Sequence, residues 1–249
     1  EITYMDAQFG RVMAHLEASG EADDTLVVFL TEQGSNFPFC KWTCYEMGLR
    51  ATAITRWPGR IASGRRNDAL IQYVDIPPTF VELAGGNPAS MDFDGRSLAA
   101  VFTTPDAPSP HQFIFGMNTT RGIARGSEAY AIRTVRDERY RLIWNLNFNA
   151  AFKNTVTHNF EPYLSWKPLV ETDAFAAQRY AGYQHRPEFE LYDLETDPWE
   201  LHNLVDDPAL QSRRTDLTAA LKRWMVQQGD QGIATEMAAF DRIPDRDPK

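Results

Sequence analysis

The chain has 249 residues, of which 43% are hydrophobic and 24% charged, and its formal net charge is −9. This length suffices for one large domain or one and a half, with a buried core, and the high aromatic content excludes general disorder. The acidic balance argues against a nucleic-acid partner. No run approaches the roughly 20 apolar residues of a membrane-spanning helix.

The chain opens on a predicted helix and strand. Over residues 1–18, apolar side chains recur at helical spacing up to Gly20, and residues 25–31 form a β-branched and apolar run typical of a buried parallel strand. Both elements look core-facing. We therefore expect most of their sheet to lie upstream of Glu1, on sequence that was removed or belongs to another chain. The end of the strand is where such sheets bind ligands.

Residues 51–57 predict a second strand, which Pro58-Gly59 ends. Asp75 has the position of a helix N-cap, because Pro77 and Pro78 follow in the first turn. Gly85-Gly86 ends that helix. The loop over 86–110 is rich in Asp, Pro and Ser, and we expect a domain boundary within it.

Beyond this loop, short apolar runs predict an antiparallel sheet followed by helices. We expect strands over 112–115, 129–133, 140–144 and 189–194, a short helix near 172–181 and another over 197–200, and a final helix over 208–228. The resulting division is 1–105 and 106–249, an α/β part followed by an α+β part.

Chemistry is expected directly after the first strand. Glu32 and Gln33 offer one carboxylate and one amide oxygen, which suit a hard cation such as Ca²⁺ or Mg²⁺, although two ligands do not complete a site. Lys41 is close enough in sequence to return to this point, where an ammonium would suit sulfate or phosphate. Taken alone, each is better explained as a solvated surface residue.

Two further features concern residues around Lys41. The stretch 41–66 holds six basic residues against the single acid Glu46, which suggests an anionic ligand, although solvated charge is the simpler explanation. Cys40 and Cys44 are too few for a metal site or a disulfide framework, and we interpret them as ordinary buried residues. Glu46 and Arg50 are expected to form a structural pair.

Several motifs together resemble the C-terminal half of the sulfatases, which share the alkaline phosphatase-like fold. They occur in family order over nearly the whole chain: Glu32-Gln33-Gly34, Lys41, Tyr45-Glu46-x-Gly48-x-Arg50, Trp57-Pro58-Gly59, Asp75-Ile76-Pro77-Pro78-Thr79, Asp94-Gly95-Arg96-Ser97-Leu98 and Glu190-Leu191-Tyr192-Asp193-Leu194-x-x-Asp197-Pro198. Within the family, residues 141–148 look most like heparan N-sulfatases (sulfamidases), whereas the Tyr45-Glu46 motif is closer to O-sulfatases.

The resemblance implies a sulfatase-type α/β sandwich followed by a small antiparallel-sheet-plus-helix subdomain. It implies a formylglycine nucleophile, Ca²⁺ rather than Mg²⁺, and a sulfated carbohydrate substrate. By position, Glu32 and Gln33 match the two late metal ligands, and Lys41 matches the sulfate-binding lysine. Glu-Gln replaces the family's Asp-His or Asp-Asn, so each side chain is longer than usual. Arg50, His158 and His185 are candidate substrate contacts.

The nucleophile motif, Cys/Ser-x-Pro/Ala-x-Arg, does not occur in the 249 residues, and the early Asp-Asp ligand pair is also absent. We therefore expect the N-terminal half of the same sulfatase as the partner of this chain. The family is found in periplasmic, secreted and lysosome-like settings. Two alternatives stay open: a phosphonate or phosphate monoester hydrolase of the same superfamily, and a degenerate carbohydrate-binding protein that has lost its metal.

Overall fold

The computed structural model describes residues 1–121 and 126–242 and divides the chain into two compact units. Residues 1–32 and 52–111 form the N-terminal unit, and residues 33–51 and 112–249 form the C-terminal unit. Residues 33–51, here called the insert segment, therefore leave one unit to pack in the other. In the described parts of the chain, no helix combines the length and apolar character needed to cross a membrane.

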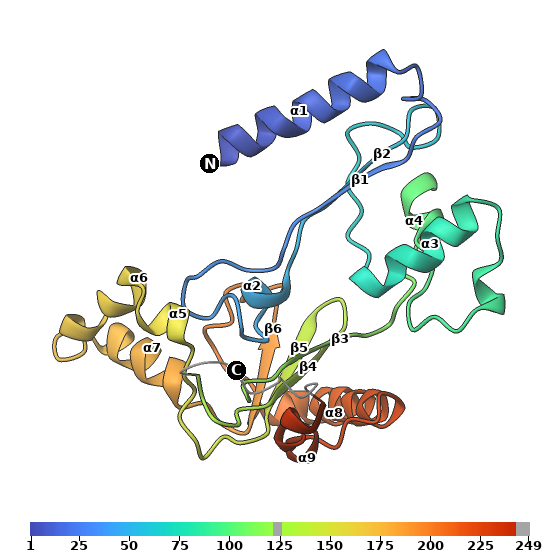
Figure 1. Cartoon of the computed structure of the whole chain (residues 1–249). Helices are drawn as coiled ribbons and strands as arrows, with labels where there is room; N and C mark the ends of the chain where they lie inside the picture. The colour runs from blue at the N-terminus through green and yellow to red at the C-terminus, as the bar shows by residue number, and fades with distance from the viewer. Residues whose placement is uncertain (122–125, 243–249) are drawn as a thin grey trace. The chain divides into compact units, whose positions relative to one another are not determined.

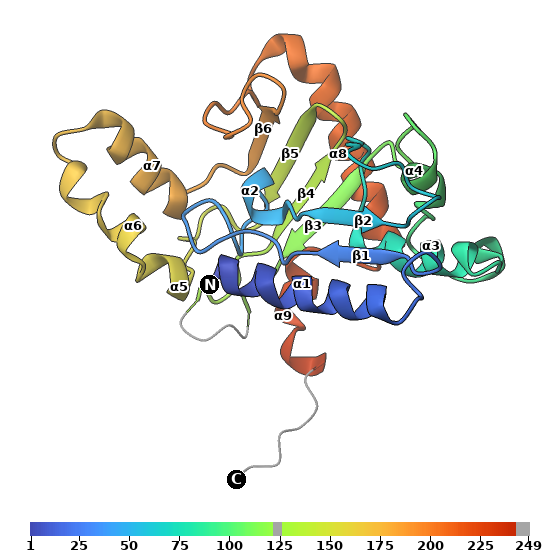
Figure 2. The same cartoon turned by 90° about the horizontal axis from the view of Figure 1, so that it is seen from above.

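The N-terminal unit begins with α1 (Ile2–Ala18), followed by β1 (Val27–Leu30) and β2 (Ala53–Arg56). The ring of Phe9 on α1 meets the ring of Phe29 on β1 at 5.2 Å, and Figure 2 shows the helix alongside the strand. The two strands pair antiparallel, and β1 is only half-buried, so the predicted buried parallel strand is wrong. A β-branched run does not encode direction, and here the chain returns after the insert segment to pair with β1.

The predicted apolar stripe of α1 is present, but it does not face a core within the described residues. None of its side chains is buried, and Met5 and Val12 on the stripe are 50% and 62% exposed. The expectation of a core-facing helix stays a prediction, because most of the sheet that it should join was expected outside these residues.

The rest of the N-terminal unit is helical: η1 (Tyr73–Asp75), α3 (Ile76–Leu83), η2 (Pro88–Ser90) and α4 (Ala99–Thr103). Asp75 takes the predicted N-cap position of α3, but its side chain has another role. The fully buried carboxylate accepts hydrogen bonds from the backbone N–H groups of Gln72 and Arg96 at 2.7 and 2.8 Å, and lies 2.9 Å from Nε2 of His111. Asp75 thereby ties the loop over 86–110 back to α3.

The C-terminal unit is built on the predicted antiparallel sheet. Its strands lie in chain order: β3 (Ile114–Asn118), β4 (Ile132–Arg136), β5 (Tyr140–Asn145) and β6 (Phe189–Asp193). The register sets Val135, Leu142 and Leu191 side by side. With Leu217 and Leu221 of α8 (Gln211–Gln227), these residues form one apolar cluster, so α8 covers this face of the sheet (Figure 1).

The opposite face is covered by the insert segment and by the aromatic region before β6. Ile132 and Ile143 of the sheet contribute to a second cluster with Tyr45, Phe152 and Tyr183. The elements here are α2 (Glu46–Leu49), α5 (Thr155–His158), α6 (Glu161–Leu164), η3 (Lys167–Leu169) and α7 (Ala174–Gln184). α7 confirms the helix predicted near 172–181, and the insert segment thus packs on the C-terminal sheet.

The last part of the unit differs from prediction in one respect. Residues 197–200 form a turn rather than a helix, because Glu200 has a left-handed φ of 53° that an α-helix does not allow. The Asp197 carboxylate accepts hydrogen bonds from the backbone N–H groups of Leu201 and His202, at 2.7 and 2.8 Å. After η4 (Pro208–Leu210), α8 confirms the predicted final helix, and α9 (Ile233–Met237) and η5 (Phe240–Arg242) follow it.

Candidate functional site

The loop that carries Lys41 closes on its own beginning. Gly34 has a φ of 63°, and a Cβ at this position would lie 2.7 Å from the backbone N of Lys41. The same N–H of Lys41 donates to the carbonyl of Ser35 at 3.0 Å. Only a glycine permits both the backbone angle and this approach. The lysine therefore returns to the point where the insert segment begins.

Lys41 lies between two residues of unusual backbone conformation. Phe39 and Trp42 have φ values of 61° and 63°, which bulky side chains rarely adopt. The ring of Phe39 is held by Tyr45, Tyr183 and the guanidinium of Arg179, at centroid distances of 5.1, 5.2 and 3.8 Å. The Nζ of Lys41 lies 5.4 Å from the Trp42 ring centre, within the range of a cation–π contact. Strain of this kind persists only where surrounding packing fixes it, and it is typical of functional loops.

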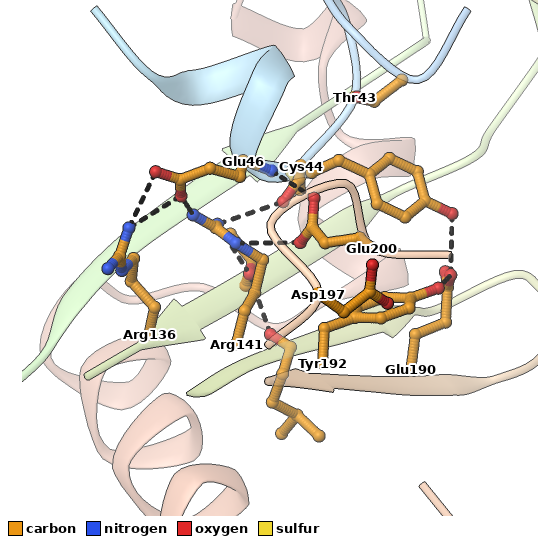
Figure 3. Close-up of polar contacts among 12 residues, drawn as sticks. Thr43, Cys44, Glu46, Arg136, Arg141, Glu190, Tyr192, Asp197 and Glu200 are labelled. Carbon is orange, nitrogen blue, oxygen red and sulfur yellow. Dashed lines mark hydrogen bonds and ion pairs between the residues drawn. The ribbon is translucent and has the colours of Figure 1, made fainter. Parts of the chain in front are cut away.

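Buried ion pairs fasten the insert segment to the C-terminal sheet (Figure 3). The Glu46 carboxylate accepts hydrogen bonds from Arg136 at 2.8 Å and from Arg141. Arg141 Nε lies 3.2 Å from Glu200 Oε1, and Arg141 Nη1 donates to the Cys44 carbonyl at 3.2 Å. Glu200 in turn accepts from the backbone N–H of Glu46 at 2.6 Å. Because both side chains of the Arg141–Glu200 pair are almost fully buried, water screens it little.

A second polar contact lies beside the first. The hydroxyls of Tyr45 and Tyr192 donate to one oxygen of the buried Glu190 carboxylate, at 2.7 and 2.6 Å. Its other oxygen accepts from the amide of Asn145 at 2.8 Å. Burial raises the pKa of Tyr45 well above its ordinary value, so the phenol keeps the proton that it donates. These hydrogen bonds from uncharged donors add to the attachment that the ion pairs provide.

The pKa values of the two glutamates in the ion-pair cluster, Glu46 and Glu200, are shifted in opposite directions. Burial alone would raise the pKa of Glu46, but the guanidinium groups of Arg141 and Arg136 outweigh it and hold that pKa below its ordinary value. Burial raises the pKa of Glu200 to about 7, despite the attraction of Arg141. The predicted pairing of Glu46 with Arg50 is wrong, because the Glu46 carboxylate turns to the sheet while Arg50 is exposed.

The two cysteines of the insert segment contribute to its packing. Both are buried free thiols, which confirms their interpretation as ordinary buried residues. Burial raises the pKa of the Cys44 thiol to about 12. Since the thiolate is the reactive and metal-binding form, Cys44 is inert at neutral pH.

The remaining predicted residues are spread over both units. Glu32 is exposed and is the last residue of its stretch in the N-terminal unit, whereas Gln33 is half-buried and begins the insert segment. His185 is exposed at the end of α7. His158 is half-buried against the rings of Tyr163 and Tyr183, where burial lowers its pKa.

Within residues 1–121 and 126–242, no three His, Cys, Asp or Glu side chains gather in a way that would hold a metal. The side-chain oxygens of Glu32 and Gln33 are suitable ligands for a hard cation. The described residues supply only part of a coordination shell. Sequence reasoning missed the ion-pair cluster, because its members lie up to 154 residues apart. The available signal was that Tyr45-Glu46, Arg141 and Glu190 all belong to the motifs quoted for the family.

The comparisons with known proteins point in one direction. Residues 34–153 match the family profile described as "N-sulphoglucosamine sulphohydrolase, C-terminal". An ulvan-active sulfatase of Formosa agariphila is 32% identical over 208 residues, which cover 84% of this chain and 39% of that protein. The human N-sulphoglucosamine sulphohydrolase is 26% identical over 241 residues, which cover 91% of this chain and 46% of that protein. The chain thus spans about two fifths of the length of these relatives.

Solved structures show the same fold. A protein solved in complex with its substrate D-glucosamine-2-N,6-O-disulfate has a TM-score of 0.66 at 22% identity, and the match covers 92% of this chain and 40% of that chain. A 2-O glycosaminoglycan sulfatase has a TM-score of 0.64 at 18% identity, with 98% and 44% covered. The predicted fold class, an α/β portion of the sulfatase type, is confirmed. The chain belongs to the sulfatase family and corresponds to the C-terminal part of its members.

Proposed function

We propose that this chain is part of a sulfatase that hydrolyses sulfate ester or N-sulfate groups on a carbohydrate. The observation that carries the proposal is the family match over residues 34–153, which includes the closed Lys41 loop and the ion pairs of Glu46 with Arg136 and Arg141 of the C-terminal sheet. The relatives named above act on ulvan or are N-sulphoglucosamine sulphohydrolases, which supports a sulfated polysaccharide as the substrate class. The division at 105/106 into a catalytic part and a subdomain belongs to the same proposal.

In this proposal, Lys41 binds the sulfate group. Its loop closes between Gly34 and Lys41, so the ammonium is carried on a constrained backbone rather than on a free loop. A fixed positive charge stabilises a sulfuryl group best when negative charge grows in the transition state. Tyr45 and Glu46, which follow Lys41 in the sequence, are held by their contacts with the C-terminal sheet. These contacts keep the segment in place, so Lys41 need not be ordered during the reaction.

Glu32 and Gln33 are proposed as two oxygen ligands of a divalent cation, Ca²⁺ in preference to Mg²⁺. Their carboxylate and amide oxygens have the chemistry that Ca²⁺ prefers, and Ca²⁺ tolerates the longer side chains better because its coordination is flexible. The formylglycine nucleophile lies outside these 249 residues and would supply the attacking oxygen. Arg50, His158 and His185 stay candidate substrate contacts.

The test uses the intact protein, meaning this chain together with its upstream sequence. It should hydrolyse an aryl sulfate and a sulfated oligosaccharide, whereas the purified 249-residue chain should hydrolyse neither. Turnover of an aryl phosphonate but no sulfate would favour the related phosphonate monoester hydrolases, two of which share this fold at TM-scores of 0.57 and 0.59. No turnover of any of these substrates would contradict the proposal.

Calorimetric titration with Ca²⁺ tests the metal separately. We expect one Ca²⁺ site in the intact protein, and we expect Glu32→Ala and Gln33→Ala each to weaken it. Glu21→Ala, at an exposed acid in the same unit, is the matched control. Unchanged affinity in both variants would remove Glu32 and Gln33 from the metal site.

A further inference from the structure

The ring of Phe39, two residues before Lys41, is contacted from outside the insert segment by one face of α7. The guanidinium carbon of Arg179 lies 3.8 Å from the centre of the Phe39 ring, and the centre of the Tyr183 ring lies 5.2 Å from it. Because Arg179 and Tyr183 are four residues apart on a helix, they share one face of it. This face of α7 therefore holds the chain shortly before the proposed sulfate-binding lysine.

The backbone of Phe39 needs such support. Its φ of 61° lies in the left-handed region, which a bulky side chain leaves unless packing holds it there. Two residues later, the N–H of Lys41 donates to the carbonyl of Ser35 at 3.0 Å, which closes the loop. A relaxed φ at Phe39 would redirect the chain that follows and shift the Lys41 side chain. The contacts of the Phe39 ring thus determine where the ammonium lies.

Arg179 is the residue of this contact that the core does not require. Tyr183 is fully buried and also packs on the rings of Phe152 and Tyr163, so its loss would disturb the apolar cluster. Arg179 is half-buried, and within residues 1–121 and 126–242 its guanidinium forms no hydrogen bond or ion pair. A guanidinium this close to a ring face makes a cation–π contact, so a change at Arg179 acts on Phe39 first.

We propose that Arg179 is a positioning residue for Lys41: its stack on Phe39 holds the left-handed backbone and so fixes the ammonium that binds the sulfate. The inference rests on the proposed sulfatase function. Arg179 itself does not touch the substrate in this proposal. A small displacement of a catalytic charge costs more in the transition state than in substrate binding, because negative charge grows there. Loss of Arg179 should therefore lower kcat more than it raises KM.

The test measures kcat and KM of the intact enzyme on an aryl sulfate. Arg179→Met keeps the length of the side chain and removes the charge, and we expect kcat to fall about ten-fold while KM stays within about two-fold. Arg179→Lys keeps a cation and should restore part of kcat. Arg214→Met is the matched control, because the Arg214 guanidinium lies 5.4 Å from the ring centre of Phe189 on the α8 side of the sheet. Its kcat should equal that of the wild type.

A double-mutant cycle separates positioning from general stability. In the Lys41→Ala background, Arg179→Met should have no further effect on kcat/KM, since the group that Arg179 positions is gone. Phe39→Leu removes the ring but keeps an apolar side chain, so it should reproduce the fall in kcat even if Arg179→Met does not fold. A kcat within about two-fold of wild type in Arg179→Met, or an equal fall in the Lys41→Ala background, would overturn the inference.

Limited digestion with trypsin gives a readout that does not depend on sulfate hydrolysis. The peptide bond after Lys41 should be cut faster in Arg179→Met than in the wild type, because the loop is held less firmly. The bond after Lys222 of α8 should be cut at the same rate in both proteins. Unchanged cutting after Lys41 would overturn the role assigned to Arg179. Failure of the wild type on every sulfate would instead overturn the proposed function.

Discussion

Arg141 is expected to be the residue on which the attachment of the insert segment most depends. It is 3% exposed, and its guanidinium contacts the carboxylates of Glu46 and Glu200, the carbonyl of Cys44 and, at 3.4 Å, the hydroxyl of Thr134. Arg141→Met keeps the length of the side chain and removes the charge. Glu46 then retains only Arg136, whereas Glu200 loses its cation in a site from which water is nearly excluded.

Removing one partner of a buried ion pair costs about 3–5 kcal/mol, and we expect Arg141→Met to lie near the lower end. The reason is that Glu200 can take up a proton. Burial already raises its pKa from 4.5 to about 7 in the presence of Arg141, so without Arg141 the carboxyl is neutral at pH 7. The remaining loss comes from the Glu46 pair and the unpaired Cys44 carbonyl.

The pH dependence of stability distinguishes the contribution of Glu200 from those of its neighbours. A carboxyl whose pKa is higher in the folded state binds more protons folded than unfolded. Its contribution to stability is therefore complete below pH 4.5 and is lost as the pH rises through 7. A shift of this size corresponds to about 3 kcal/mol. Glu200→Gln should remove this fall in stability between pH 4.5 and 7.

The assay is urea unfolding of the intact protein between pH 4.5 and 8, with a double-mutant cycle of Arg141→Met and Glu200→Gln. The two changes should be coupled, because each alters the charge that the other faces. Arg213→Met, at an exposed ion pair with Asp137, is the control and should cost less than about 1 kcal/mol. If Arg141→Met costs no more than this control, the ion pairs do not hold the insert segment.

Three further changes test other parts of the structure. Lys41→Ala should lower kcat/KM of the intact enzyme by about 10²–10³ without loss of folding, and Lys41→Arg should restore little; retention of a third of the activity would contradict a sulfate contact. Cys44 should resist alkylation at pH 8 in the native protein and react once unfolded; native labelling would contradict its raised pKa. Gly95→Ala should cost several kcal/mol of stability, because its Cβ would lie 1.9 Å from the Val74 carbonyl oxygen. Gly182→Ala should stabilise α7, because its Cβ would meet no atom within 4 Å. Equal melting temperatures for the two variants would refute this reasoning.

Local patterns predicted most of the elements but not their partners. The helix over 1–18, the strand over 140–144 and the final helix follow from residue periodicity and were found at those places. Direction and burial of β1 were mistaken, since an apolar run reads the same in either orientation. Its actual partner lies beyond the insert segment, at a distance that periodicity does not reveal.

The same limit applies to the site. The position of Asp75 before Pro77 predicted an N-cap, but its buried bond to His111 joins residues 36 apart. The sulfate-binding role of Lys41 stays a prediction from the family motif, whereas its return towards the start of the loop was expected from the short spacing and is found at Gly34.

The path of the insert segment has a practical consequence for anyone who wishes to dissect this protein. Because residues 33–51 leave the N-terminal unit and return to it, no single cut separates the two units. A fragment that begins at residue 112 would lack Tyr45 and Glu46, leaving Glu190 and Arg141 exposed where they are now covered. An independent C-terminal unit would require the insert segment to be rejoined through a new linker. Exchange of this unit between related enzymes would therefore need two matched crossovers, one on each side of the segment.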